Sequence, residues 1–251
     1  MKIALLGYGK MGRFIEDLAL AAGDEIVLRV DEANRASVRP QDLAAADVAI
    51  EFSRPEAAVG NIDLALAAGV PIVVGTTGWL AQLPQVSERV KAAEGALFWA
   101  SNFSVGVNVF FAAARRTAEL LNPYGTYQVS IEETHHLQKL DAPSGTAITL
   151  AETVAAALDA YAGWELSEVK SSVPQTQITA PASPATPVPI VSVREDAVPG
   201  THHLSFDSTV DRLELRHTAH SRAGFAEGAL AAARWLVGRR GVFSMPDLLN
   251  L

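Results

Sequence analysis

The densest group of chemically active side chains lies between residues 132 and 146. The segment reads Glu-Glu-Thr-His-His-Leu-Gln-Lys-Leu-Asp-Ala-Pro-Ser-Gly-Thr and stands between a predicted strand and a predicted helix. Histidine suits proton transfer near neutral pH, and lysine offers a cation to an acidic substrate. Ser144, Gly145 and Thr146, at the start of the helix, offer hydroxyl and free N–H groups that suit a carboxylate. The segment therefore predicts a site that binds a small anion and gives it a proton.

A metal site is the first alternative, since all six histidines fall between residues 135 and 220. His135 and His136 point to opposite faces of an extended chain, and the sequence has no cysteine that could supply a thiolate. We therefore expect no metal. Ser144 is also a good helix cap, whether or not it touches a substrate. The histidines at 202, 203, 217 and 220 are expected to be structural or interface residues, because no acid–base pair surrounds them in the sequence.

A second chemical signal is the glycine pattern G-x-G-x-x-G at the start of the chain, formed by Gly7, Tyr8, Gly9, Lys10, Met11 and Gly12. It follows a predicted strand, 3–6, and opens a predicted helix, 11–22, which is the context that a dinucleotide-binding loop requires. The first glycine permits the tight turn, the second lets a pyrophosphate approach the backbone, and the third lets the helix pack on the strand. The alternative is a glycine-rich turn that binds another ligand.

The choice between NADH and NADPH stays open. Asp31 follows the second predicted strand, 25–30, where an acidic side chain accepts the hydroxyls of the adenine ribose. Its carboxylate favours NADH and repels the 2′-phosphate of NADPH. Lys10 stands in the glycine loop and offers a charge that offsets this repulsion.

Two more loops follow predicted strands at the edge where open α/β sheets bind ligands. The first contains Gly75, Thr76 and Thr77, and the second contains Ala100, Ser101, Asn102 and Phe103. Both offer backbone groups and small side chains to a nicotinamide. Each is also compatible with a simple turn.

The elements that must hold the glycine loop alternate between strand and helix. Apolar runs predict strands at 3–6, 25–30, 48–52, 70–74 and 97–100, and amphipathic alanine-rich stretches predict helices at 11–22, 55–68 and 83–94. Strands that alternate with helices of this length form a parallel, doubly wound sheet. The first hundred residues are therefore predicted to form a Rossmann domain.

The pattern changes after about residue 105. Helices are predicted at 107–121 and 146–162, a strand at 127–133, and antiparallel strands at 191–194, 202–207 and 212–217. Residues 171–190 hold five of the 13 prolines, which predicts an extended loop or edge strand and not an interior strand. A last helix, 224–237, ends at Gly238 and is expected to return to the first domain. The predicted fold class is α/β, an N-terminal Rossmann domain followed by an α+β domain with a mixed sheet.

Composition excludes several classes of function. The formal net charge of −8 argues against nucleic acid, whose binding proteins carry a basic surface. No run approaches the roughly 18 apolar residues that cross a membrane. The N-terminus lacks the features of a signal peptide, and the absence of cysteine agrees with the cytoplasmic location that we expect.

Several motifs, in order, resemble those of the 4-hydroxy-tetrahydrodipicolinate reductase (dihydrodipicolinate reductase) family. The resemblance covers nearly the whole chain. The most specific motif is E-T-H-H followed by K-L-D-A-P-S-G-T-A, at residues 133–136 and 139–147. The others are E-F-S-R-P-E-A at 51–57, G-T-T-G at 75–78, N-F-S-V-G-V-N at 102–108 and F-A-E-G-A-L at 225–230.

The resemblance implies a reductase of diaminopimelate and lysine biosynthesis that uses NADH or NADPH and acts on a small dicarboxylate. It implies a Rossmann domain made of residues 1–106 and 216–251, and a substrate and tetramer domain made of residues 107–215. It places the acid–base histidine at His135 and the catalytic lysine at Lys139. The substrate's carboxylate would be held by His136, Gly145 and Thr146, with Ser144 close by, and the two loops at 75–77 and 100–103 would lie at the nicotinamide.

One departure from the family concerns the glycine loop, which in the family is usually one residue longer, G-x-x-G-x-M-G. Alignment from Met11 and Gly12 keeps Lys10 at the family's basic position and shortens the turn before it. Two alternatives stay open at this point. One is an amino-acid or oxo-acid dehydrogenase of similar build, which has no special need of the His-His-x-x-Lys run; the other is a regulatory protein that binds a dinucleotide without turnover.

Overall fold

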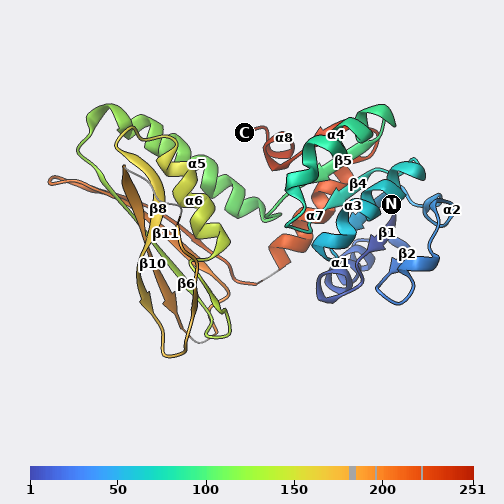
Figure 1. Ribbon diagram of the computed structural model, residues 1–251, viewed down its shortest axis with the longest axis horizontal. Coiled ribbons are helices and arrows are strands. Elements are labelled where there is room, and N and C mark those ends of the chain that lie inside the picture. Colours follow the sequence, from blue (N-terminus) through green and yellow to red (C-terminus); the bar gives the residue numbers. More distant parts are fainter. Residues whose placement is uncertain (181–184, 196, 222) are drawn as a thin grey trace. The chain divides into compact units, whose positions relative to one another are not determined.

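The computed structural model describes residues 1–180, 185–195, 197–221 and 223–251, and the chain divides into two compact units (Figure 1). The first unit contains Met1–Val105 and Ala223–Leu251, and the second contains Gly106–Arg222. Among the described residues no helix combines the length and the apolar character needed to span a membrane.

The first unit is built on a six-stranded sheet with the order β13-β5-β4-β3-β1-β2, in which every pair is parallel. Its strands are β1 (Lys2–Leu6), β2 (Glu25–Val30), β3 (Val48–Glu51), β4 (Ile72–Val74), β5 (Ala96–Trp99) and β13 (Gly241–Phe243). Its helices are α1 (Lys10–Ala21), α2 (Pro40–Leu43), α3 (Pro55–Ala67), α4 (Leu83–Ala92), α7 (Ala223–Leu236) and α8 (Met245–Leu249). The predicted Rossmann sheet is confirmed; α2, β13 and α8 were not predicted.

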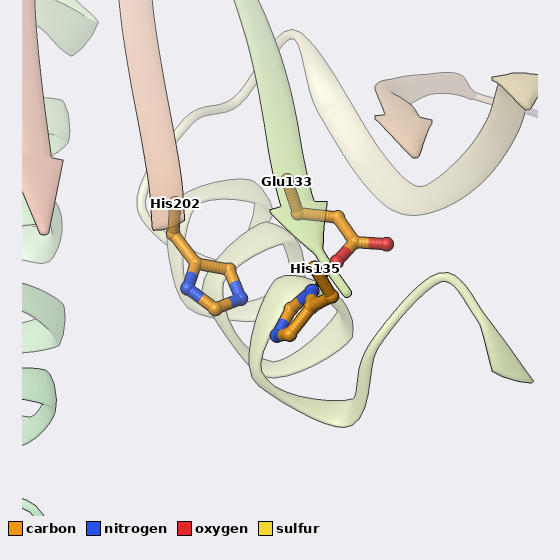
Figure 2. A group of neighbouring side chains, drawn as sticks. All are labelled: Glu133, His135 and His202. Carbon is orange, nitrogen blue, oxygen red and sulfur yellow. Dashed lines mark hydrogen bonds and ion pairs between the residues drawn. The ribbon is translucent and has the colours of Figure 1, made fainter. Parts of the chain in front are cut away.

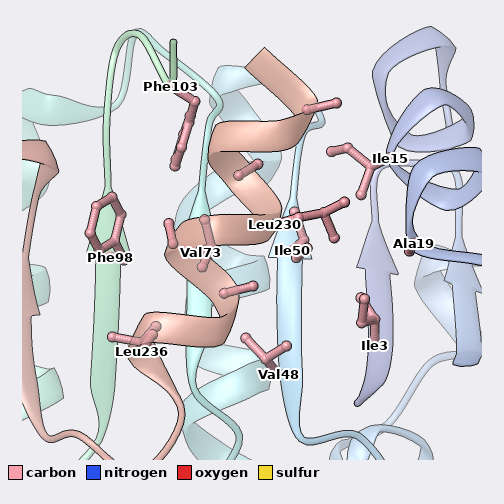
Figure 3. Close-up of a cluster of buried hydrophobic side chains, with 14 of the residues drawn as sticks. Ile3, Ile15, Ala19, Val48, Ile50, Val73, Phe98, Phe103, Leu230 and Leu236 are labelled. Carbon is pink, nitrogen blue, oxygen red and sulfur yellow. The ribbon is translucent and has the colours of Figure 1, made fainter. Parts of the chain in front are cut away.

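Helices cover both faces of this sheet, which explains why β3 is buried along its whole length. One core joins the sheet to α1 and α7, and a second joins it to α3 and α4. Figure 3 shows Leu230 and Leu236 of α7 among Val48, Val73 and Phe98 of the strands. A Cβ on Gly228 of α7 would lie 1.8 Å from the carbonyl oxygen of Phe103, so this helix holds the loop after β5 by direct backbone contact.

The second unit is built on a five-stranded mixed sheet with the order β12-β11-β6-β10-β8. Its strands are β6 (Gln128–His135), β8 (Tyr161–Lys170), β10 (Thr186–Arg194), β11 (Thr201–Asp207) and β12 (Arg212–Thr218). Helices α5 (Val105–Leu121) and α6 (Gly145–Ala155) pack on one face of the sheet through a common core. A short pair, β7 (Asp141–Ala142) and β9 (Thr176–Gln177), lies apart from this sheet. The predicted mixed sheet is confirmed, but the strand predicted to be antiparallel at 191–194 is the end of β10, which is parallel to both of its neighbours.

The prediction for the proline-rich segment, 171–190, was wrong at its C-terminal end, and its residues 181–184 lie outside the described part of the chain. β10 contains Pro187 and Pro189, yet it is an interior strand between β6 and β8, and it is parallel to both. Its pairing with β6 begins only at Ile190, so both prolines lie where the strand has a partner on one side only. The two prolines, which lack an N–H group, therefore remove no hydrogen bond between β10 and β6.

Two predicted boundaries also need correction. The helix predicted at 146–162 ends at Ala155, and β8 begins at Tyr161. The alanine-rich composition continues past the end of α6, which hid the change to a strand that places Trp164 in the core. β12 continues to Thr218 in register with β11, so residues 216–218, predicted to return to the first domain, belong to the second sheet.

Candidate active site

The glycine loop between β1 and α1 has the backbone geometry that its sequence predicts. Gly7 has φ +106°, and a Cβ there would lie 2.1 Å from the carbonyl oxygen of Phe52. The N–H groups of Gly7 and Tyr8 both donate to the carbonyl oxygen of Val30, at 2.8 and 2.9 Å. A Cβ on Gly12 would lie 2.3 Å from the carbonyl oxygen of Gly7. Only glycine fits at Gly7 and Gly12, and the turn is held against β2.

The start of α1 is open to a ligand. Gly9 is the N-cap residue, and no atom lies within 4 Å of an ideal Cβ built on it. Lys10, Met11 and Gly12 form the first turn, whose N–H groups have no partner within the helix. These groups and the helix dipole suit a pyrophosphate.

A substitution at Gly9 tests this role without disturbing the fold. We expect Gly9→Ala to keep the melting temperature of the protein, because the backbone is extended there, with φ −91°, and the added methyl group meets nothing. The methyl group occupies the approach of the pyrophosphate, so the Kd for NADH should rise about tenfold or more in a fluorescence titration. Gly12→Ala, which clashes with Gly7, should lose thermal stability as well. Unchanged NADH binding by Gly9→Ala would contradict the assignment.

A cavity of about 890 Å³ opens beside this loop at the carboxyl edge of the sheet. Asp31 lies on its wall and is held in a turn, since its Oδ1 accepts the N–H groups of Ala33 and Asn34 at 2.9 and 3.2 Å. Sequence reasoning missed the other polar residues of this wall, which are Glu32, Arg35, Ser53, Arg54, Glu56 and Asn61. The E-F-S-R-P-E-A motif was the available signal for three of them.

The loops predicted at the nicotinamide side meet at Phe52. A Cβ on Gly75 would lie 2.1 Å from the ring of Phe52, and the rings of Phe52 and Phe103 have centroids 5.6 Å apart. Phe103 is buried in the core, so its backbone is what it offers to a ligand. Ala100 and Thr76 are also buried, whereas Thr77 and Ser101 are exposed. Asn102 accepts the N–H group of Ser104 at 2.9 Å, which shapes the second loop.

The second unit brings a histidine and a carboxylate together at the end of β6. His135 and Glu133 lie two residues apart on the same face of the strand, and Nδ1 of His135 shares a short hydrogen bond with Oε2 of Glu133 (Figure 2). Arg194 of β10 forms an ion pair with Oε1 of Glu133 at 2.9 Å, and both side chains are fully buried. Sequence reasoning missed Glu133 and Arg194 as functional residues.

Glu133 fixes the orientation and the tautomer of His135. Burial opposes the charge on Glu133, but hydrogen bonds and charges from His135, Ser192 and Arg194 lower the pKa of Glu133 to about 2. The ionised carboxylate accepts a hydrogen bond from the N–H group at Nδ1, which leaves Nε2 to exchange a proton with a substrate. Gly200 faces that atom, since a Cβ there would lie 3.0 Å from Nε2.

His202 also belongs to this group, although the sequence suggested a structural or interface role. Its ring stands edge-on to that of His135 with centroids 5.2 Å apart (Figure 2). Its Nε2 lies 3.1 Å from Oγ of Ser144. Burial and the charge of His135 lower the pKa of His202 to about 3, so the ring is neutral. The histidine reaches the site because β11 pairs with β6, a contact that local spacing does not reveal.

The depressed pKa of His202 predicts a loss of stability in acid. In the unfolded chain this histidine takes up a proton near its ordinary pKa of 6.5, whereas in the folded protein it does so only near 3. The free energy of unfolding should therefore fall as the pH drops from 6.5 to 3, by about 1.4 kcal/mol per pH unit for this group. Denaturant titrations at several pH values in this range give the free energy of unfolding as a function of pH, and this free energy should change less steeply with pH in His202→Gln. In His203→Gln, on the same strand, the dependence on pH should match that of the original protein. The same dependence on pH in all three proteins would refute the burial effect.

Glu133, His135 and His202 also form the one group among the described residues with the spacing of metal ligands, all within 4.8 Å of one another. The site does not fit a metal ion well, because the guanidinium group of Arg194 already neutralises the carboxylate and Nδ1 of His135 faces Glu133. The arrangement suits proton transfer better.

Lys139 and the start of α6 supply positive charge next to this group in the sequence. Nζ of Lys139 donates to both carboxylate oxygens of Asp141, at 2.9 and 2.8 Å, a partner that sequence reasoning missed. Oγ of Ser144 caps α6 by accepting the N–H group of Ala147 at 3.1 Å, which confirms the predicted cap. Gly145 is exposed with open space at its Cβ position, and Thr146 is half-buried, so the first turn of α6 is accessible to a carboxylate. His136 is half-buried in the turn before Lys139.

Comparison with known proteins decides the family. Residues 1–103 match the family model "Dihydrodipicolinate reductase, N-terminus", and residues 106–249 match "Dihydrodipicolinate reductase, C-terminus". The chain belongs to the dihydrodipicolinate reductase family. It is therefore an oxidoreductase whose Rossmann-type domain implies a nicotinamide cofactor, which removes the regulatory alternative and the separate dehydrogenase alternative.

Individual members of the reductase family match over the full length. The 4-hydroxy-tetrahydrodipicolinate reductase of Christiangramia forsetii is 42% identical over 252 residues, which cover 100% of this chain and 98% of the relative. That of Ralstonia nicotianae is 35% identical over 272 residues and is covered completely, as is this chain. The dipicolinate-bound dihydrodipicolinate reductase of Paenisporosarcina sp. TG-14 shares the fold, with a TM-score of 0.77, 23% identity and 98% coverage of both chains. Outside the reductases, amine dehydrogenase from Mycobacterium smegmatis has a similar fold, with a TM-score of 0.61 at 11% identity. The match covers 98% of this chain and 95% of the amine dehydrogenase chain.

Proposed function

We propose that this reductase converts 4-hydroxy-tetrahydrodipicolinate to tetrahydrodipicolinate in the diaminopimelate and lysine pathway, with NADH or NADPH as the reductant. Full-length relatives carry that name, and one fold relative is described with bound dipicolinate, a planar dicarboxylate. The observation that carries the proposal is the pairing of His135 with the buried Glu133–Arg194 ion pair, in the unit that also presents Lys139 and the open start of α6.

The proposed substrate site neutralises two carboxylates. Lys139 carries a cation beside Asp141, and Gly145 and Thr146 offer N–H groups at the positive end of α6. His136, in the turn between His135 and Lys139, completes the proposed set, with Ser144 as the cap that keeps the helix start in place. These groups explain how a protein with a net charge of −8 binds an acidic substrate.

His135 is the proposed proton donor, with Nε2 as the atom that gives up the proton and Glu133 as the partner that stabilises the charged ring. The nicotinamide, when bound, supplies the hydride. One substrate, one reduced cofactor and one proton give tetrahydrodipicolinate, the oxidised cofactor and one water. Lys139 holds a substrate carboxylate while the proton is transferred.

The cofactor cleft contains features that suit NADH and others that suit NADPH. Oδ1 of Asp31 is occupied by the turn, so the other carboxylate oxygen is the one that can accept hydrogen bonds from the ribose hydroxyls. Arg35 and Arg54 lie on the same wall and offer cations to a 2′-phosphate. However, Arg54 pairs with Glu32 at 2.9 Å, and Arg35 donates to Asn61 and Gly60. We therefore propose that either NADH or NADPH serves, and that their rates differ.

A coupled assay tests the reaction. The substrate is made fresh from pyruvate and aspartate semialdehyde by the upstream synthase, and the absorbance of the reduced nicotinamide is followed with NADH and NADPH in parallel. We expect a loss of absorbance that requires both this protein and the synthase. No loss with either cofactor, from protein that still binds NADH, would overturn the proposal.

A homotetramer in the cytoplasm is the proposed working form. Both helices of the second unit cover one face of its sheet. The opposite face carries a row made by Val191, Glu132, His203 and Arg216 across four paired strands, and this row suits contact with a second copy. Light scattering coupled to size-exclusion chromatography should give four chains per particle, and a monomer would refute the tetramer.

Fractionation of source cells should place the protein with the cytoplasmic enzymes. Sedimentation of the protein with the membranes would refute the cytoplasmic location.

A further inference from the structure

Glu51, the last residue of β3, is a fully buried carboxylate with no part in the proposed reaction. It occupies the face of the sheet that packs on α3, beside apolar residues of the second core. Burial raises its pKa, which is the expected response of a carboxyl group without a cation against it. An apolar side chain would avoid the cost of burying this group, so its contribution to stability does not account for it.

The hydrogen bonds of Glu51 are concentrated on one oxygen. Oε1 accepts the N–H group of Ser53 at 3.1 Å, the hydroxyl of Ser53 in a short bond, and the amide of Asn61 at 3.2 Å. Oε2 is buried and has no hydrogen-bond partner. Ser53 and Asn61 both line the cavity beside the glycine loop. Glu51 therefore stands directly behind the cavity wall and holds two of its residues.

The same network reaches both the cavity wall near Asp31 and the loop at 75–77. Oδ1 of Asn61 accepts a bond from Nε of Arg35 at 2.5 Å, on the side of Asp31. The N–H group of Ser53 also donates to Oγ1 of Thr76 at 2.8 Å, in the loop predicted at the nicotinamide. Between them, Phe52 packs on Gly75 and on Phe103. One carboxylate oxygen thus connects the cavity wall near Asp31, the expected adenosine side, with the loop at 75–77, which is predicted at the nicotinamide.

We propose that Glu51 is a positioning residue of the cofactor cleft, which holds Ser53 and Asn61 so that the adenosine wall and the nicotinamide loop fit one dinucleotide. This inference rests on the proposed function to the extent that the cleft holds NADH or NADPH. The residue touches neither the cofactor nor the substrate; it acts through Ser53 and Asn61.

Cofactor titration of the full chain tests this role. Glu51→Met keeps the length of the side chain and removes the acceptor, so we expect a stable protein whose Kd for NADH and NADPH is raised about tenfold. Glu51→Gln keeps an acceptor oxygen and removes the charge, so its Kd should stay within about twofold of the original protein. Ile50→Val, on the same strand but facing the other core, should lower the melting temperature without changing the Kd. Glu51→Ala replaces Glu51→Met if the latter does not fold.

The outcomes separate this proposal from the proposed reaction, because binding is measured by nicotinamide fluorescence without substrate. Unchanged affinity in Glu51→Met, or an equal loss in Ile50→Val, would overturn the positioning role while turnover by the original protein stands. Original protein that binds NADH but reduces no substrate would overturn the reaction and leave the role of Glu51 intact. Original protein that binds neither nicotinamide would overturn both.

Discussion

In the His135→Ala variant we expect kcat to fall by about a hundred- to ten-thousand-fold, the range that general acid–base catalysis contributes, with an unchanged Kd for NADH. The ring is the one described imidazole that a buried ionised carboxylate holds at Nδ1, so its loss removes an oriented proton donor. The glycine loop and its cavity belong to the other unit, so cofactor binding has no reason to change. Steady-state kinetics and fluorescence titration measure the two quantities.

The matched control for this variant is His220→Ala. His220 is exposed and lies after the end of β12, outside both the proposed site and the row proposed to contact a second copy. Its removal should leave kcat within about twofold of the original value, as expected for a substitution of an exposed side chain. Near-normal turnover by His135→Ala, or an equal loss in the control, would refute the proton-donor role.

For Lys139→Ala we expect a rise in KM for the substrate and a fall in kcat, each by about ten- to a hundredfold, because a charge-assisted contact to a substrate carboxylate is lost. The thermal stability should hardly change. The partner left behind, Asp141, has a side chain that is 46% exposed, so water solvates its carboxylate once the lysine is gone.

Two further substitutions sharpen this experiment. Lys170→Ala removes an exposed lysine of β8 in the same unit, paired with Glu168 at 3.5 Å, and should leave both kinetic constants unchanged. Lys139→Arg keeps the charge and should recover most of the KM if the lysine only binds the carboxylate. A normal KM and a normal kcat in Lys139→Ala would remove the residue from the site.

The glycine loop was predictable because its constraints are local. A tight turn at Gly7 and close packing at Gly12 require glycine whatever the rest of the chain does, and the strand and helix that flank the loop have clear patterns of their own. The cap at Ser144 was predictable for the same reason, since its hydrogen bond spans three residues.

The electrostatic centre of the second unit was not predictable from spacing. Glu133 and His135 are close in sequence, but Arg194 reaches them on β10 and His202 on β11. These contacts depend on the order of the strands, and the prolines of β10 led to the prediction that this segment is not an interior strand. The parallel pairing that carries Arg194 beside Glu133 is therefore a property of the folded sheet and not of any local pattern.

Transfer of a labelled hydride tests the central claim most directly. The protein would be given freshly made 4-hydroxy-tetrahydrodipicolinate with NADH or NADPH carrying deuterium at the transferable position, and the product would be analysed by mass spectrometry. The proposed function predicts tetrahydrodipicolinate that carries one deuterium and has one oxygen atom fewer than the substrate, because the water that leaves is replaced by a deuteride and a proton. Oxidation of the cofactor without label in that product, or label found only in an aminated acid, would contradict it.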